Sequence, residues 1–529
     1  MNTVKDIVIF GGKKGADKPQ YTFYNFDGEV EMKTFAQVNY DLTGLGQYLY
    51  KLGLRGKKVA ILSENSYYWI ACYFSIITGK ITAVPMDPKL PDDDIIDIMI
   101  RSGCNAIYYS EDFKDTVEKM KKTDGVVIEQ YIKIEDFYSM VKEGHNEVKN
   151  GVESYLEDEV LPSDLAFLVY TSGTTGKSKG VMLSQENVAA DSVASCRVMT
   201  GGPAIGFLPL HHAFSWVGAL FSGNLLTEWG FICRSLKDIQ KDMNTYHPQN
   251  FSAVPLAVET IYKKIWFTAK KSGREEMLKK GLKISNFLLK LGIDKRRKIF
   301  SEILNNLGGN LEMIVCGGAY LDEQYEKGME AFGIKIINGY GITECSPAVT
   351  CNRLDAYKVG SVGIPLPCNE IKIKDPDEDG IGEICVKGKN VMVGYYNDPE
   401  ATAEVFDGDW FLTGDYGYID EDGFLFFKGR KKNLIILSNG KNVSPEEIED
   451  KLSTIDYVKE VVVYEEKGYI TAEFFLDTVE TPDAKGRIKA DVNEINRKMP
   501  SYKQVTRIKT RDNEFPKTTT LKILRDYKK

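Results

Sequence analysis

The stretch KKVAILSENSYYWIACYFSIITGKITAVPM, residues 57–86, decides the fold class of this chain. KKVAIL is a short buried strand, residues 66–79 form an apolar helix that ends at a glycine, and ITAVPM is the next strand. A helical periodicity over residues 35–54 precedes this stretch, and the strand-like NAIYYS (105–110) follows it. This alternation predicts a parallel sheet with crossover helices, and therefore an α/β fold.

The alternation continues until the pattern changes near Ile371. LAFLVY (165–170) and MIVCGG (313–318) are further buried strands that end in small residues. Functional sites in open parallel sheets gather beyond such carboxyl ends. From Ile371 onward, Asp-Gly turns join short strands, as in residues 371–388 and 417–430. We expect a large N-terminal domain of parallel and mixed sheets that also contains an antiparallel, β-barrel-like part.

A second domain is expected to begin near Lys432. Ser444 followed by Pro445 and Glu447 has the pattern of a capping-box helix start, with Pro at the first helical position. Strand-like segments follow at residues 458–466 and 469–476. We therefore expect an N-terminal domain of residues 1–431 and a small α+β domain of residues 432–529.

The composition excludes several classes of protein. The 529 residues include 68 basic and 76 acidic side chains, and the net charge of −8 argues against general nucleic-acid binding. No apolar run reaches about 18 residues, so no transmembrane helix is expected. The start MNTVKDIVIF lacks the layout of a signal peptide. Nine scattered cysteines and four histidines supply no typical zinc site, and a reduced cytoplasmic protein fits best.

The stretch LVYTSGTTGKSKGVMLSQENV (168–188) allows three interpretations. Residues 176–180 match the G-x-S-x-G of a hydrolase nucleophile turn, but that turn passes directly into a helix, whereas Val181–Leu183 is expected to be extended. A P-loop requires glycine where Thr171 stands. Glycines, hydroxyls and two lysines instead favour a phosphate-binding loop over a flexible surface loop.

YTSGTTGKSKGV (170–181) resembles the phosphate loop of the adenylate-forming superfamily, which includes acyl-CoA synthetases, luciferases and the adenylation domains of peptide synthetases. The other motifs of this superfamily follow in order over nearly the whole chain: LPLHHAFSW (208–216), NGYGITECSP (338–347), WFLTGDYG (410–417), GRKKN (429–433) and PKTTTLKILR (516–525). The chain is most similar to the long-chain fatty acyl-CoA synthetases of this superfamily.

This resemblance implies an AMP-forming ligase that uses ATP, Mg²⁺ and coenzyme A. Such an enzyme joins a carboxylic acid to the α-phosphate of ATP, expels pyrophosphate, and then transfers the acyl group to a thiol. Two anions must meet in the first step, so the site has to neutralise charge and align the attack.

The resemblance also implies a nucleotide site built from several motifs. Thr343 and Glu344 would serve phosphate and Mg²⁺, with Thr171 as the second metal-binding residue, and Asp415 would accept the ribose hydroxyls with help from Arg430. The phosphate loop would consist of Thr171, Ser172, Gly173, Thr174, Thr175, Gly176 and Lys177. The adenine slot and the strand beside it would consist of Gly317, Gly318, Ala319, Asn338, Gly339, Tyr340 and Gly341.

Two lysines are implied in catalysis and domain motion. Lys522 resembles the catalytic lysine of the superfamily, whose ammonium contacts both the attacking carboxylate and the α-phosphate. Leu521 stands where relatives usually have glycine, which puts the positioning of that lysine in question. Lys432 falls at the hinge about which the small domain would swing between the two half-reactions.

The substrate side is less specific. His212 and Trp216 fall on the motif of the substrate helix, where a tryptophan gates the acyl tunnel of some long-chain synthetases; the alternative for Trp216 is ordinary core packing. Val254 and Gly317 are small enough to border an alkyl chain. A long-chain fatty acid is the expected substrate, and an aryl or medium-chain acid is the alternative.

Residues 263–298 contain thirteen Lys or Arg and three Asp or Glu, a net charge of +10. They form either solvated helix faces or a docking face for an anionic partner, such as lipid headgroups in a peripheral membrane contact, the phosphates of coenzyme A, or an acidic acyl carrier protein. Coenzyme A is the expected acceptor, and loading of a carrier protein is the alternative. A kinase or NTPase and a non-catalytic nucleotide-binding relative are the remaining hypotheses.

Overall fold

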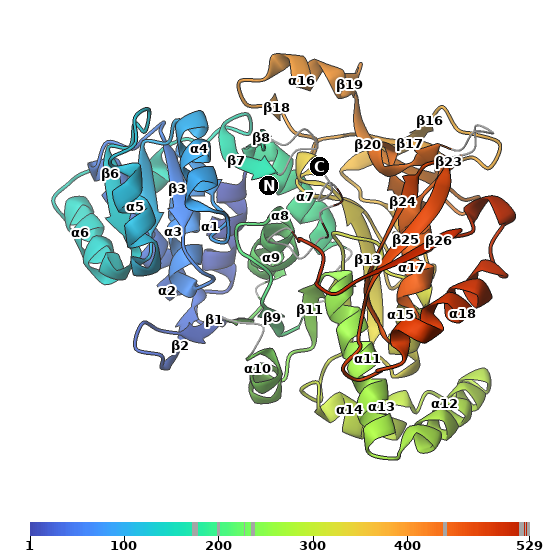
Figure 1. Ribbon diagram of the computed structural model, residues 1–529. Coiled ribbons are helices and arrows are strands. Elements are labelled where there is room, and N and C mark those ends of the chain that lie inside the picture. Colours follow the sequence, from blue (N-terminus) through green and yellow to red (C-terminus); the bar gives the residue numbers. More distant parts are fainter. Residues whose placement is uncertain are drawn as a thin grey trace.

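The computed structural model describes residues 1–171, 178–197, 202–226, 228–233, 238–436, 442–517, 523 and 525. These residues form two large sheets, a five-stranded antiparallel sheet and a three-stranded sheet near the C-terminus, with helices packed around them (Figure 1). The predicted α/β fold is confirmed. In the described part of the chain, no helix has both the length and the apolar character that crossing a membrane requires.

The first large sheet contains the stretch that predicts the fold. Its seven strands lie in the order β18-β8-β7-β4-β3-β5-β6, with β3 to β7 parallel and with β8 and β18 antiparallel at one edge. The bounds are β3 Lys58–Leu62, β4 Thr82–Pro85, β5 Ala106–Tyr109, β6 Gln130–Lys133, β7 Leu165–Thr171, β8 Lys179–Ser184 and β18 Gly394–Tyr395.

The crossover between β3 and β4 is helix α3, Tyr67–Ile77. The Ser66 hydroxyl caps this helix by accepting from the N–H of Trp69, which satisfies a backbone donor at the helix start. Every residue of α3 is buried, because the helix packs against α1, α2 and the sheet. This explains why it is apolar all round rather than along one stripe.

The second large sheet has nine strands in the order β15-β14-β13-β12-β11-β9-β10-β1-β2. The central strands from β13 to β1 are parallel, whereas β14, β15 and β2 pair in the antiparallel sense. The bounds are β1 Pro19–Tyr24, β2 Val30–Thr34, β9 Ala204–Gly206, β10 Gly230–Ile232, β11 Asn250–Ala253, β12 Met313–Cys316, β13 Lys335–Gly341, β14 Ala348–Cys351 and β15 Ile364–Pro365.

Helices cover both sheets and extend beyond them. Around the N-terminal strands lie α1 Val4–Lys14, α2 Phe35–Lys51, α4 Asp92–Ser102, α5 Lys114–Met120, α6 Phe137–Lys149 and α7 Gln185–Cys196. Later in the chain follow α8 Ala213–Ser215, α9 Ser222–Leu226, α10 Ile239–Tyr246, α11 Pro255–Lys271, α12 Glu275–Lys290, α13 Arg296–Ile299, α14 Ser301–Asn305, α15 Glu323–Ala331 and α16 Pro399–Glu404.

The expected antiparallel part is a five-stranded sheet. Its strands are β16 Asn369–Lys374, β17 Gly382–Gly388, β19 Phe406–Asp407, β20 Trp410–Ile419 and β21 Leu425–Arg430, and every pairing between them is antiparallel. The Asp-Gly turns predicted from the sequence join β16 to β17 and β20 to β21.

The C-terminal part has its own apolar cluster, made of residues between 435 and 505. Ser444 caps α17 by accepting from the N–H of Glu447 at 3.3 Å, so the predicted helix start is confirmed. The reciprocal bond of the predicted capping box is not made, because the Glu447 carboxylate accepts from Lys503 at 2.6 Å instead. The elements are β22 Ile435–Ile436, β23 Asn442–Val443, α17 Pro445–Ser453, β24 Val458–Glu466, β25 Tyr469–Leu476, α18 Ala484–Asn496 and β26 Arg507–Arg511.

Candidate active site

Three predicted residues from two sheets meet around one buried carboxylate. Asp415 is 2% exposed, and its Oδ2 accepts from the Tyr340 hydroxyl at 2.8 Å. Arg430 lies opposite Asp415 in the β20–β21 pair, with its Nε 3.3 Å from Asp415 Oδ1. Burial, together with the Asp415 charge, holds the pKa of Tyr340 well above its ordinary value, so its hydroxyl remains a donor. The arrangement orients a carboxylate that can accept from hydroxyl groups.

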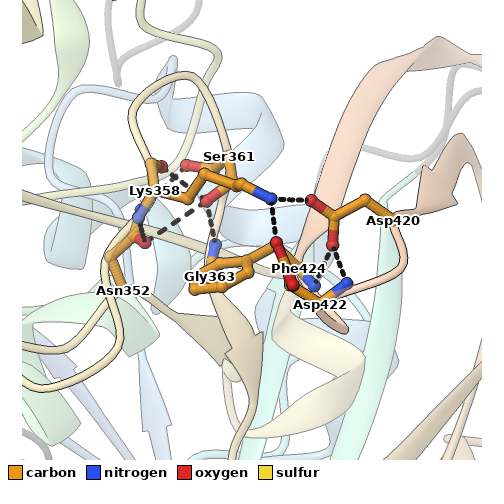
Figure 2. A network of polar contacts seen from close by, with 7 residues as sticks. All are labelled: Asn352, Lys358, Ser361, Gly363, Asp420, Asp422 and Phe424. Atoms are coloured by element: carbon orange, nitrogen blue, oxygen red, sulfur yellow. Dashed lines mark hydrogen bonds and ion pairs between the residues drawn. The ribbon is translucent and has the colours of Figure 1, made fainter.

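A polar network fastens the β20–β21 hairpin to the nine-stranded sheet (Figure 2). The Lys358 ammonium donates to Asp420 at 2.5 Å and to Asp422 at 2.6 Å, both in the turn of the hairpin. Ser361 and Lys358 also donate to Asn352 Oδ1, which follows β14. Burial disfavours ionisation of Asp420, but Lys358 and backbone N–H groups keep its pKa below the ordinary value. The network thereby holds Asp415 in place relative to Tyr340.

Glycines allow a close approach of the backbone at the end of β13 and an unusual backbone conformation after β12. A Cβ on Gly341 would lie 1.9 Å from the Pro347 carbonyl oxygen, and a Cβ on Gly339 would lie 3.1 Å from the Thr350 carbonyl oxygen. Gly318 has φ +88°, a conformation that favours glycine. Only glycine can occupy position 341, because the backbone of β13 lies so close to Pro347 there. The second glycine of the NGYGITECSP motif therefore permits this close approach.

The remaining residues of the predicted adenine slot divide into two groups. Gly317, which follows β12, is buried, whereas Gly318 and Ala319 are exposed. An ideal Cβ built on Gly317 would lie 3.5 Å from the Phe214 ring. Asn338 is buried and donates to Glu326 of α15 at 3.1 Å. The Asn338 side chain is therefore committed to a structural contact between β13 and α15.

The two metal-side residues lie on different elements. Glu344 belongs to a 3₁₀ turn, Thr343–Cys345, and its Oε1 accepts from the Tyr395 hydroxyl at 3.0 Å. The Lys179 ammonium lies over the Tyr395 ring, 4.7 Å from its centroid. Thr171, the last residue of β7, pairs with Lys179 across the β7–β8 ladder. Tyr395 thus connects the turn that contains Glu344 with the end of the phosphate-loop motif.

The phosphate-loop motif is bordered by a strand on each side: β7 ends at Thr171, and β8 begins at Lys179. β8 continues from Lys179 through Val181–Leu183, so the extended conformation predicted for these residues is confirmed, and a strand-to-helix nucleophile turn is excluded. Arg101 of α4 donates to the Ser178 carbonyl at 2.6 Å and to its hydroxyl at 2.7 Å, which anchors the motif on one side. Ser172, Gly173, Thr174, Thr175, Gly176 and Lys177 lie outside the described residues.

The substrate-helix motif lies between the two large sheets. His212 caps α8, with its Nδ1 3.4 Å from the N–H of Phe214. Trp216 is fully buried, donates its indole N–H to the Leu210 carbonyl at 2.6 Å and stacks on Phe167 of β7. Trp216 has the contacts of a core residue, so a gating role for it stays a prediction. Val254 lies 3.9 Å from an ideal Cβ on Gly318.

The hinge motif is held by an acidic residue that sequence reasoning missed. Glu383 of β17 accepts from Lys431 at 2.8 Å and from the N–H of Gly414 at 3.2 Å, so it joins the T-G-D turn to the hinge. Lys432 is exposed in the 3₁₀ turn that follows β21. Tyr395 and Arg101 were missed in the same way, because none of these three residues lies inside one of the superfamily motifs.

Lys522 and Leu521 lie outside the described residues. The described residues that follow them in the sequence are Ile523, which pairs with Lys517, and Arg525. The Arg525 guanidinium makes ion pairs with Glu446 and Glu449 of α17 and donates to the Val463 carbonyl at 3.2 Å. These contacts attach Arg525 to α17 and β24.

Two family models match the chain. The model of the AMP-binding enzyme family matches residues 12–396, and the model of the AMP-binding enzyme C-terminal domain matches residues 432–527. The chain is 30% identical to long-chain-fatty-acid–CoA ligase 5 of Mus musculus over 85% of this chain and 71% of the relative. It is 29% identical to the long-chain-fatty-acid–CoA ligase of Escherichia coli O6:H1, over 96% and 91%.

Solved structures share the fold. An anthranilate CoA ligase in complex with anthranoyl-AMP superposes with a TM-score of 0.79 at 21% identity, over 98% of this chain and 95% of that chain. The o-succinylbenzoate coenzyme A synthetase of Bacillus subtilis, in complex with ATP and magnesium ion, superposes with a TM-score of 0.75 at 23% identity, over 98% of each chain. The protein is therefore a member of the AMP-binding enzyme family, the adenylate-forming superfamily that its motifs resemble.

Proposed function

We propose that this protein is an ATP-dependent ligase that couples long-chain fatty acids to coenzyme A. It forms an acyl-adenylate with release of pyrophosphate, and then a thioester with release of AMP. Two relatives that align over most of this chain are named long-chain-fatty-acid–CoA ligases, which supports both the reaction and the acid. The single observation that carries the nucleotide site is the buried Asp415 oriented by Tyr340 and Arg430.

The residues present fit a nucleotide. Asp415 accepts the ribose hydroxyls, because its contacts with Tyr340 and Arg430 orient its carboxylate. Gly317 and Gly318, which follow β12, can border a flat ring, because the atoms nearest to an ideal Cβ on them lie 3.5 Å and 3.9 Å away. The phosphate-loop motif, Thr171–Lys177 in the sequence, lies between β7 and β8, where its N–H groups and hydroxyls grip the β- and γ-phosphates.

Glu344 and Thr171 would hold Mg²⁺ together with phosphate oxygens, since a carboxylate and a hydroxyl are the hard oxygen donors that this ion prefers. When bound, the ion supplies positive charge where two anions meet. Thr343 orients the same phosphates from the neighbouring position. Tyr395 holds one Glu344 oxygen by a hydrogen bond, which fixes the direction of the carboxylate.

We propose that Lys522 contacts the attacking carboxylate and the α-phosphate during adenylation, from a mobile domain of residues 432–529. Lys432 is the hinge residue, and after adenylation the domain turns so that the thiol replaces Lys522. His212, Trp216, Val254 and Gly317 border the acid. The polar joint between Glu383, Lys431 and Gly414 supports a hinge at this place, because it clamps the chain on one side of Lys432.

Product analysis with purified protein tests the reaction. Formation of AMP and pyrophosphate that depends on acid and coenzyme A is expected, and ADP as the product would point to a kinase or NTPase instead. A panel of acids from acetic to stearic acid, with benzoic and anthranilic acids, tests the substrate, and the highest kcat/KM is expected for the long alkyl chains. Preference for an aryl or medium-chain acid would refute the long-chain proposal, and thioester formed only on an acyl carrier protein would replace coenzyme A as acceptor.

A further inference from the structure

Helix α12 presents large apolar side chains to solvent. Met277, Ile284 and Phe287 of α12, together with Leu291 directly after its last residue, are called here the apolar ridge; they are 61%, 56%, 62% and 59% exposed. At 100° per residue they fall within an arc of roughly 80°, so they form one stripe along about 21 Å of helix. The opposite face already packs, because Leu278 and Leu282 contribute to the cluster around Phe300 and Phe332. The apolar ridge is therefore not part of the core of the protein.

Lysines lie within the apolar ridge and along one side of it. Lys280 falls within the same arc, Lys283 and Lys290 flank it on one side, and all three are exposed. Among the residues that the structure describes, no carboxylate lies within ion-pair distance of these three lysines or of Lys270, Lys271, Lys295 and Lys298, although neighbours such as Lys279 and Arg274 are paired. Of the thirteen cations in residues 263–298, Lys280, Lys283 and Lys290 thus lie on α12 beside the exposed apolar side chains without an ion-pair partner among the described residues.

The position of α12 leaves this face accessible. Figure 1 shows α12, α13 and α14 at the outer edge of the molecule, away from both large sheets. Helix α11 adds Phe267, which is 46% exposed near the end of the helix, with the Lys271 ammonium 5.8 Å from its ring centroid. The two helices therefore present apolar and cationic groups together at one periphery of the protein.

We propose that the outer face of α12, with the end of α11, binds the surface of an anionic lipid bilayer. An exposed apolar stripe with adjacent lysines is the pattern of an interfacial helix, whose apolar side chains enter the boundary of headgroups and acyl chains while the ammonium groups meet anionic headgroups. A bilayer fits better than an acidic protein, because four large side chains project as a continuous ridge and long lysine side chains reach around it. This surface is distinct from the nucleotide site.

The test is flotation of the full-length protein with vesicles, without ATP, acid or coenzyme A, so that its outcome does not depend on the proposed reaction. Vesicles of phosphatidylcholine and phosphatidylglycerol should bind the wild type, pure phosphatidylcholine should bind it weakly, and high salt should reduce binding to the anionic vesicles. Lys283→Gln with Lys290→Gln, which alters no packed residue, should weaken binding about ten-fold or more. Ile284→Ser with Phe287→Ser should weaken binding to a similar extent.

Matched controls are exposed residues outside this surface. Lys122→Gln with Lys149→Gln, and Val127→Ser with Val479→Ser, should leave vesicle binding unchanged. Circular dichroism and thermal unfolding confirm that each variant is folded. The proposal is overturned if the wild type does not float with anionic vesicles, or if both α12 variants, folded, bind as well as the wild type. It is equally overturned if an acidic acyl carrier protein binds this face while vesicles do not.

Discussion

The Tyr340 hydroxyl and the Asp415 carboxylate are joined by a 2.8 Å hydrogen bond across two sheets, although they are 75 residues apart in the sequence. Tyr340 lies on β13 of the nine-stranded sheet, and Asp415 lies on β20 of the five-stranded sheet. This contact therefore depends on how the two sheets pack against each other. The Lys358 network in Figure 2 stabilises that packing.

Tyr340→Phe should weaken ATP binding more than it slows chemistry. The change removes a donor to a buried carboxylate, a loss of about 1.5–3 kcal/mol, so the KM for ATP should rise by about ten-fold or more while kcat changes less. Steady-state kinetics measure both. Tyr464→Phe is the matched control, since it removes a 3.0 Å tyrosine–carboxylate bond to Glu473 elsewhere; an equal effect of both variants would contradict a specific role for Tyr340.

Gly341→Ala should damage the site through the backbone. Its Cβ would lie 1.9 Å from the Pro347 carbonyl oxygen, so β13 and β14 must separate, at a cost of about 1–3 kcal/mol. The midpoint temperature of thermal unfolding should fall, and nucleotide binding should be lost. Gly206→Ala is the control, because its Cβ would meet nothing closer than 3.8 Å. A Gly341→Ala protein with normal stability and nucleotide affinity would show that the close approach is not required.

Glu344→Gln should raise the Mg²⁺ concentration needed for acid-dependent ATP–pyrophosphate exchange by about ten-fold or more, because an amide oxygen is a weaker ligand for this ion than a carboxylate. Tyr395→Phe should also raise the Mg²⁺ requirement, but by less, because it removes only the hydrogen bond that orients the Glu344 carboxylate. Mg²⁺ titrations of both variants measure the effect, and an unchanged requirement in Glu344→Gln would exclude Glu344 as a metal ligand.

Lys522→Ala should slow adenylation by roughly 10²–10³ yet spare thioester formation from preformed acyl-adenylate. The reason is that this lysine serves the transition state of the first half-reaction alone. Separate assays of the two half-reactions test it, with the exposed Lys485→Ala, which breaks only an ion pair to Asp512, as control. Equal loss of both half-reactions would refute a domain that turns between them.

The free energy of unfolding should depend on pH through the protonation of Glu449. Burial raises its pKa to about 7 despite the neighbouring Arg525, from an ordinary value of 4.5. The folded protein therefore holds this proton more tightly than the unfolded chain does, so the contribution to stability is greatest below about pH 4.5, falls as the pH rises to about 7, and is constant above.

Glu449→Gln should flatten this fall in stability, which amounts to about 3 kcal/mol. Unfolding of the wild type and the variant is compared between about pH 5 and 7.5, with the exposed Glu480→Gln as control. If the wild type and Glu449→Gln lose stability in parallel over this range, Glu449 is not the titrating group.

Much of the fold was predictable from local patterns. The strand–helix–strand pattern of residues 57–86 corresponds to β3, α3 and β4, and the cap at Ser444 begins α17. Both are predictable because periodicity and capping depend on neighbours in sequence. The motifs likewise indicated the family, since each requires particular residue types at short, fixed spacing.

Other features depended on segments distant in sequence. Asn338 falls inside a motif, yet its side chain contacts Glu326 of α15, whereas Tyr395 falls outside the quoted motifs and binds Glu344. Trp216 matches a gating position by spacing, yet it stacks within the core on Phe167. No local pattern specifies which element will pack against a given side chain.

By itself, the sequence determined the α/β class, the order of the motifs and the excess of positive charge over residues 263–298, because each of these is a property of residues close together along the chain. Only the tertiary structure decided that Asp415 meets Tyr340 and that the apolar ridge of α12 faces solvent. Helix α12 has apolar residues on two faces, and periodicity cannot tell which face the core covers. The packing of α12 against the rest of the chain made that choice.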